Sequence, residues 1–247
     1  MAVFRAIVFC AALVGLITGI AVSAVQHVAT TPLILRAEGY ERAAEAAPVS
    51  HTHDGTTHQH ASAAEATAHD QQQEHHHNAE AWAPREGFER AAFTVLANIV
   101  TAIGYALALT GLIALRGKPI DWRQGLLWGL AGFAAVMIAP SLGLPPELPG
   151  VPAAPLFDRQ VWWIGTALCT ALGLALTAFG RRPFAIALAL CLIAAPHVIG
   201  APQLDDVVTN VPAALSHQFT VAVTLVSLLF WALLGALSGA LYPRLAR

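Results

Sequence analysis

The chain has 247 residues, of which 56% are hydrophobic and only 11% are charged. Soluble proteins carry about a quarter of their residues as charged side chains, so this composition is typical of an integral membrane protein and argues against a separate soluble catalytic domain. The net charge of −2 provides no positive field for holding nucleic acid, which excludes that class of partner.

Six segments of the chain contain no Asp, Glu, Lys or Arg. They cover residues 6–27, 91–115, 124–140, 160–180, 184–200 and 218–241. A helix needs about 20 apolar residues to cross the hydrocarbon core of a bilayer, and a charge at its centre costs about 3 kcal/mol. We therefore expect an all-α integral membrane protein in which residues 1–247 form a single membrane domain, with a bundle of about six transmembrane helices.

The first of these segments has a second interpretation. The small residues Val22, Ser23 and Ala24 match the cleavage site of a secretory signal peptide. The uncharged stretch is longer than the roughly 7 to 15 residues of an ordinary signal-peptide core, which favours a helix that stays in the membrane.

Positive charges predict the orientation of the chain in the membrane. The two short loops on the side opposite the N-terminus carry only Arg159, whereas eight basic residues fall on the side of the N-terminus. The eight are Arg5, Arg116, Lys118, Arg123, Arg181, Arg182, Arg244 and Arg247. Because cytoplasmic loops are enriched in Lys and Arg, we expect both termini in the cytoplasm and the long loop over residues 28–88 outside.

This long loop contains eight of the eleven histidines of the chain. They are His51, His53, His58, His60, His69, His75, His76 and His77. The tract has almost no apolar side chains to bury, so we expect the loop to be largely disordered. Imidazole binds Co, Ni, Cu and Zn, so the pattern favours external capture of a divalent metal over the alternative of a solubilising linker, without selecting the metal.

A second group of polar residues falls near the outer ends of the predicted helices. His27 ends the first helix, His197 lies at the end of the fifth, His217 begins the sixth, and Glu147 lies in a loop between them. Polar groups at one depth predict the mouth of a cation pathway, although a single interfacial histidine can also simply contact headgroups and water.

Pro140 and Pro196 interrupt the outer ends of the third and fifth segments. Each removes an amide hydrogen and frees the carbonyl four residues earlier, on Val136 and Leu192. Interrupted helices supply such oxygens to ions in membrane carriers, but a helix end that meets the interface also tolerates proline, and both interpretations stay open.

Other residues predict how the helices pack. Asn98 is expected to make a hydrogen bond between helices, worth about 1 kcal/mol. The similar pentapeptides 128–132 and 231–235 lie on helices of opposite direction, which suggests a possible three-plus-three inverted repeat. Glycines four residues apart predict a close approach of helix backbones. They are Gly15 with Gly19, Gly125 with Gly129, and Gly235 with Gly239.

The sequence contains no phosphate-binding GxxxxGK[ST] loop, no HExxH pair, no GxSxG elbow and no CxxC pair. We therefore expect a protein that is not an enzyme, holds no permanent cofactor and depends on a gradient, the membrane potential or a partner for energy.

Distinct motifs occur from the first predicted helix to the last. They are Val25-Gln26, Pro32-Leu33-Ile34, Ala37-Glu38, Trp82-Ala83-Pro84 with Gly87 and Glu89-Arg90, GLLWGLAG at 125–132, GLPPELPG at 143–150, RQVWW at 159–163, Pro196-His197 with Gly200-Ala201-Pro202, and Phe230-Trp231. These motifs resemble the CbtA family of predicted bacterial cobalt transporter subunits. Arg159, Gln160, Trp162, Trp163 and Pro196 are among the residues that fall on the family motifs, as do Glu147 and His197.

The resemblance implies uptake of cobalt, or of a similar metal such as nickel, across a bacterial inner membrane. It also implies a small single-helix partner subunit, CbtB, with histidines of its own. Some family members are described with five helices, which leaves the sixth span and the side of the C-terminus open. Two other functions remain: a membrane metal buffer or scaffold that delivers ions to another permease, and a redox protein with His27, His197 or His217 as haem ligands.

Overall fold

The computed structural model describes residues 1–45, 84–180, 182–204 and 206–246, and every regular element in these ranges is helical. The helices that run along the bundle are α1 (Ala2–Ala29), α3 (Phe88–Arg116), α4 (Trp122–Phe133) with its continuation, α6 (Leu156–Phe179), α7 (Pro183–Ile199) and α8 (Ala213–Leu245). Five spans, including α4 and its continuation, are long and apolar enough to cross a membrane, while α7 is a shorter apolar helix. The expected all-α membrane protein is therefore confirmed.

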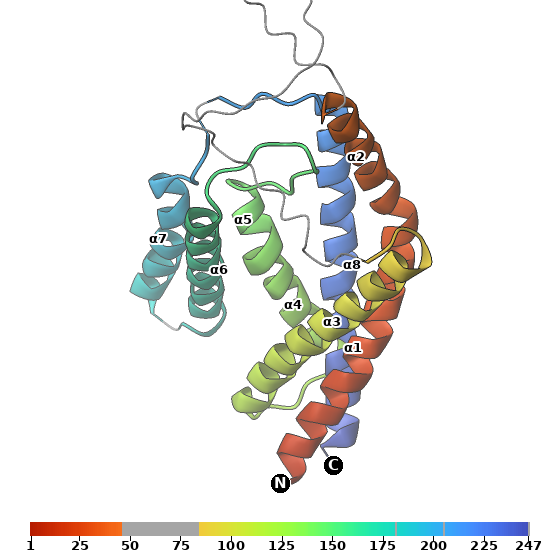
Figure 1. Cartoon of the computed structure of the whole chain (residues 1–247). Helices are drawn as coiled ribbons and strands as arrows, with labels where there is room; N and C mark the ends of the chain where they lie inside the picture. Colours follow the sequence, from red (N-terminus) through yellow and green to blue (C-terminus); the bar gives the residue numbers. More distant parts are fainter. Residues whose placement is uncertain (46–83, 181, 205, 247) are drawn as a thin grey trace, which may run out of the picture.

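Successive long helices run in opposite directions, and both termini lie at the same end of the molecule (Figure 1). At the other end lie α2 (Thr31–Glu45) and the connections over residues 142–155, 200–204 and 206–212. We call this second end the loop end.

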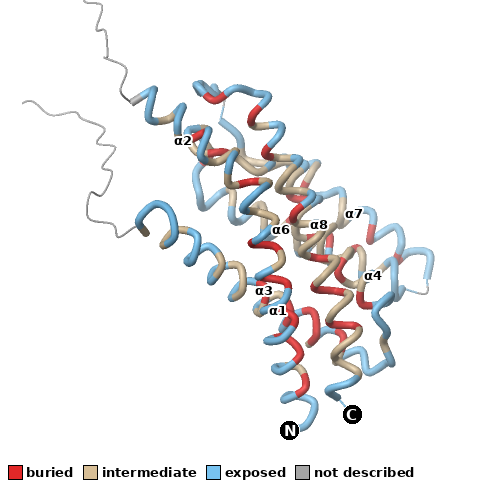
Figure 2. The backbone as a smooth tube through the Cα atoms, turned by 90° about the vertical axis from the view of Figure 1, so that its right-hand side faces the viewer, coloured by how far each residue is buried: buried red, intermediate tan, exposed pale blue. Residues whose placement is uncertain are grey.

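The main core lies where α1, α3 and α8 meet. Its buried side chains include Cys10 and Val14 of α1, Leu109 of α3, and Trp231 and Leu234 of α8. Many large apolar side chains point the other way and are exposed, among them Leu16, Ile20, Leu112 and Leu225. Buried and exposed positions alternate along the same helices (Figure 2), as expected when one face packs and the other contacts lipid.

Glycines allow two helix pairs to approach closely. On α4 and α8, an added Cβ at Gly235 would lie 2.7 Å from the Cα of Gly129, and one at Gly239 would lie 2.8 Å from the Cα of Gly125. Gly15 and Gly19 of α1 face the backbone of α3 in the same way. The predicted close packing of these glycines is confirmed, whereas the inverted repeat stays a prediction.

The helical hairpin of α6 and α7 lies to one side of the main bundle (Figure 1). Gly173 of α6 permits close contact with Ile193 and the carbonyl of Ala189 on α7. The hairpin reaches the rest of the molecule through α6, which packs on the upper part of the third span.

Helix α2 is a helix that the sequence did not predict. It lies within residues 28–88, which we expected to be largely disordered, yet residues 31–45 are helical. The reason is burial: Ala37 is fully buried in a small core with Leu148, Val211 and Leu215 at the loop end. The local composition of the loop did not reveal these distant partners.

Candidate functional site

The motif GLPPELPG, residues 143–150, lies in a connection that is held from several sides at the loop end. Thr220 of α8 donates a hydrogen bond to the carbonyl of Pro146 at 3.4 Å, and Thr209 donates one to the carbonyl of Gly150 at 2.9 Å. Leu148 is buried in the core below α2. Gly150 has φ +77°, which favours glycine at this position. The motif therefore positions its central residue, Glu147, rigidly.

Glu147 forms an ion pair with Arg159 in the first turn of α6. The Nη2 atom of Arg159 donates to Oε2 of Glu147 at 2.8 Å, and both side chains are about 70% buried, with exposed fractions of 29% and 27%. The Nε atom of Arg159 is buried and has no hydrogen-bond partner among the described residues. The carboxylate is thus held by a cation of the protein itself.

His197 is positioned by Trp162, which lies three residues after Arg159 on α6. The Nε1 atom of Trp162 donates to the carbonyl of Pro196 at 3.1 Å, and the indole meets the imidazole of His197 edge to face, with centroids 6.0 Å apart. Gly143 lies beneath the same indole, where a Cβ would collide with the ring. Pro196 is buried inside α7, and its carbonyl also accepts the N–H of Gly200, which ends the helix.

Arg159 and Trp162 are neighbours on one face of α6, because residues three apart in a helix lie side by side. They bring Glu147, from the 143–150 loop, and His197, from α7, to the same turn. We call Glu147, Arg159, Trp162, Pro196 and His197 the α6-turn cluster. It contains one carboxylate and one imidazole, both of which are ligands for divalent transition metals.

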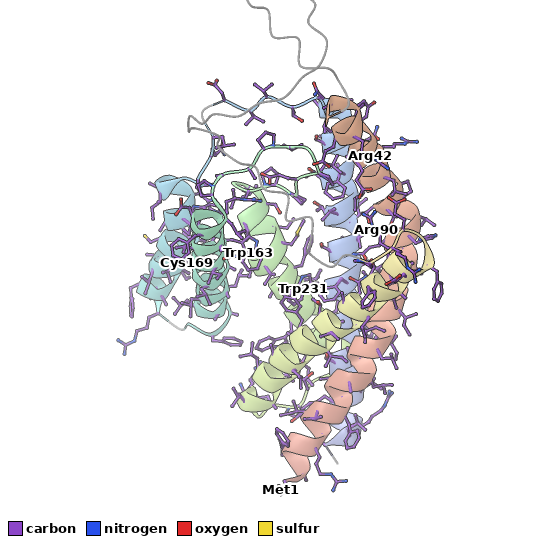
Figure 3. The ribbon with its side chains drawn as sticks, in the orientation of Figure 1. Met1, Arg42, Arg90, Trp163, Cys169 and Trp231 are labelled. Atoms are coloured by element: carbon purple, nitrogen blue, oxygen red, sulfur yellow. The ribbon has the colours of Figure 1, made fainter. Side chains whose placement is uncertain are left out.

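The other predicted site residues are Gln160 and Trp163, on the same turn of α6, and His27 and His217, on other helices. Gln160 is exposed on α6, and Trp163, labelled in Figure 3, is half-buried. His27 is exposed near the end of α1, and His217 is exposed on α8, beside a groove lined by α1.

The structure does not assemble the predicted mouth into a metal cage. Within the described ranges, no three His, Cys, Asp or Glu side chains come together as a ligand set. A metal role for His27, His197, His217 and Glu147 therefore stays a prediction. The eight histidines between residues 51 and 77 lie outside the described residues.

The third span is interrupted near the loop end, as Pro140 predicted. After α4 the chain forms a π-helix, η1 (Ala134–Ile138), followed by α5 (Ala139–Ser141). The N–H of Ala139 donates to the carbonyl of Ala134, five residues earlier, and the hydroxyl of Ser141 donates to the carbonyl of Met137 at 2.6 Å. π-Helical turns occur frequently at functional sites, and this one packs against α6 below the cluster. The sequence indicated the break but not its π-helical form.

A polar contact inside the membrane region links α1 and α3. The amide of Asn98 donates to the hydroxyl of Ser23 at 2.9 Å and to the side-chain carbonyl of Gln26 at 2.6 Å. Ser23 in turn donates to the carbonyl of Gly19 at 2.7 Å. The predicted interhelical hydrogen bond of Asn98 is confirmed, although the sequence did not identify its partners.

Sequence reasoning missed an ion pair between α2 and α3. The guanidinium of Arg90, labelled in Figure 3, forms two hydrogen bonds with the carboxylate of Glu38, one of them at 3.2 Å. The hydrogen bond from Arg90 lowers the pKa of the Glu38 carboxyl below its ordinary value. Glu38 and Arg90 both lie in motifs given above, Ala37-Glu38 and Glu89-Arg90. Their presence in these motifs was the hint in the sequence that the two residues interact.

Comparison with known proteins identifies the family of this chain. A family model described as "Probable cobalt transporter subunit (CbtA)" matches residues 4–243. No curated protein and no solved structure matches the chain. Since the family match spans nearly the whole sequence, this chain belongs to the CbtA family of cobalt transporter subunits.

Proposed function

We propose that the chain is the membrane-embedded subunit of a transporter that takes up cobalt, or a similar divalent ion such as nickel. The observation that carries this proposal is the family match over residues 4–243, which omits only two residues at the start of the first candidate span and two at the end of the last. A transporter subunit works with a partner, and we propose a small single-helix protein resembling CbtB.

The proposed orientation places the termini in the cytoplasm of a bacterial inner membrane and the loop end in the periplasm. Its support is the basic charge at the opposite end, where Arg5, Arg116, Lys118, Arg123 and Arg244 lie. Cytoplasmic ends of membrane proteins are enriched in such residues. A Gly55→Cys variant of a chain with its three native cysteines replaced tests the orientation. An impermeant maleimide should label it in intact spheroplasts, and labelling that requires lysis would reverse the orientation and refute import.

We assign capture of the metal ion at the outer surface to the eight histidines between residues 51 and 77. Deleting residues 50–78 should weaken cobalt uptake at low metal concentration and leave it unchanged at high concentration. A complete loss at every concentration would instead make this segment part of the pathway. Acidification below about pH 6.5 should act like the deletion, because a protonated imidazole cannot bind a metal.

Entry into the membrane region is assigned to Glu147 and His197 of the α6-turn cluster. An arriving cation has to compete with Arg159 for the carboxylate, since the two are already joined at 2.8 Å. This competition keeps binding weak, which suits passage, because an ion that binds too tightly cannot leave. The imidazole of His197, held against Trp162, supplies a nitrogen ligand near the same turn.

Uptake of radioactive cobalt by cells tests this assignment. Glu147→Gln and His197→Ala should each raise the cobalt concentration for half-maximal uptake by about tenfold, equivalent to about 1.4 kcal/mol. The matched control for the first is Asp158→Asn, which makes the same chemical change at an exposed residue beside Arg159 in the first turn of α6. Unchanged uptake in both test variants, at equal expression, would remove the cluster from the pathway.

Liposomes containing the purified chain, with and without the partner, distinguish a permease from a metal buffer. A permease moves cobalt into the lumen in at least one of the two preparations. If both preparations bind cobalt and neither accumulates it, the chain is a buffer or scaffold that delivers metal elsewhere.

A further inference from the structure

A groove follows α8 on the side where it packs beside α1 and α2. Its lower part, with a volume of about 500 Å³, lies between α1 and α8 and is lined mainly by apolar side chains, including Val25, Ala29, Val221, Ala222 and Leu225. Its upper part, of about 480 Å³, lies between α2 and α8 and includes Arg36 and Tyr40. Gln218 lines both parts, so they meet at this residue.

The change in polarity along the groove coincides with the edge of the membrane region. No Asp, Glu, Lys or Arg occurs between Arg5 and Arg36 or between Asp206 and Arg244, so Arg36 carries the first charge after α1. The apolar part therefore lies at the depth of lipid chains, and the part with Arg36 and Tyr40 lies at the depth of headgroups.

Arg36 differs from Arg90 and Arg159 in its pairing. Arg90 pairs with Glu38 and Arg159 with Glu147, whereas Arg36 makes no ion pair within the described part of the chain. It is exposed on the groove face of α2, one turn before Tyr40. A guanidinium beside a phenol hydroxyl provides donors that match a phosphate group.

We propose that this groove binds one phospholipid with an anionic headgroup. Its phosphate contacts Arg36 and Tyr40, and one acyl chain lies along Ala29, Ala222 and Leu225. The polar donors above and the apolar walls below occur in the order in which a lipid presents its headgroup and chain. This inference depends on membrane embedding alone, so it stands or falls independently of the metal that is transported.

Native mass spectrometry of the detergent-purified full chain tests the proposal, with dioleoyl phosphatidylglycerol and dioleoyl phosphatidylcholine as probes. The native protein should retain the anionic lipid about fivefold better than the zwitterionic one, as expected for one basic residue near a lipid headgroup. Arg36→Gln should abolish this preference and Arg36→Lys should keep most of it. Arg42→Gln is the matched control, because it removes the same charge from a different face of α2 and should leave the preference intact.

The apolar part of the groove is tested by filling it. Ala222→Trp should lower retention of both lipids at least fivefold, whereas Leu228→Trp, at an exposed position of α8 outside the groove, should leave retention unchanged. Gel filtration verifies that each variant remains monodisperse. The proposal would be overturned if the native protein retained the two lipids equally. It would also be overturned if Arg36→Gln and Arg42→Gln reduced the preference for the anionic lipid equally. The proposal would also be overturned if Arg36→Gln or Ala222→Trp stopped binding the partner subunit while the preference for the anionic lipid stayed unchanged.

Discussion

The contact between α4 and α8 permits a quantitative prediction for Gly235→Ala. The added Cβ would lie 2.7 Å from the Cα of Gly129, whereas an ordinary contact of this kind begins at 3.4 Å. It would also meet the carbonyl of Gly125, so both obstacles are backbone atoms that no side-chain rotation can move. The two helices must therefore separate, which weakens their packing along the whole glycine interface. Overpacking of this kind costs about 1–3 kcal/mol, so the equilibrium should shift toward unfolding by about 5- to 150-fold.

Titration of the purified protein from a mild detergent into SDS measures this loss, with tryptophan fluorescence as the signal. Trp231 lies at the interface and reports on it directly. Gly111→Ala is the matched control: it makes the same change inside α3, where an added Cβ meets no atom within 4 Å. Alanine is a better helix former than glycine by up to about 1 kcal/mol, so this variant should gain stability. If Gly235→Ala unfolds at the same SDS fraction as Gly111→Ala, the glycine interface does not hold the two helices together and the reasoning fails.

Three further predictions concern polar groups. Asn98→Leu should destabilise the protein by about 1 kcal/mol in the same titration, because two interhelical hydrogen bonds are lost; an unchanged midpoint would show that they contribute nothing. The Glu38 carboxyl has a lowered pKa in the folded protein, so its ion pair stabilises the fold above the ordinary pKa of 4.5 and this stability is lost as the pH falls through the lowered value. Arg90→Gln should reduce that pH dependence of unfolding, and an identical dependence in both proteins would contradict the assignment. Cobalt uptake at low concentration should fall more steeply below about pH 6.5 in the full-length protein than after deletion of residues 50–78.

The candidate site shows where prediction from sequence reached its limit. His197 and Glu147 could be selected singly, because each is a polar residue at the end of an apolar segment and lies in a distinctive motif. Depth in the membrane also grouped them with His27 and His217, but depth says nothing about position around the bundle. In the structure His217 faces a groove beside α1, while His197 contacts Trp162 on the α6–α7 hairpin.

Helix α2 shows the same limit for the fold. Its polar composition resembles that of the histidine-rich tract that follows, so the sequence did not separate the two. The fold separates them, because Ala37 packs against Leu148 and Val211, more than a hundred residues away. The ion pair of Glu38 with Arg90 depends on the same docking of α2.

The apolar helices, the glycine contacts and the interhelical role of Asn98 followed from the sequence alone. Each rests on a rule that operates within one helix: the length needed to cross a bilayer, the spacing of small residues, or the cost of a lone amide in lipid. The pairing of Glu147 with Arg159, the contact of Trp162 with His197 and the groove beside Arg36 were decided only by tertiary structure. These features join residues from different helices, and their geometry depends on how the helices pack around one another, which no single segment encodes.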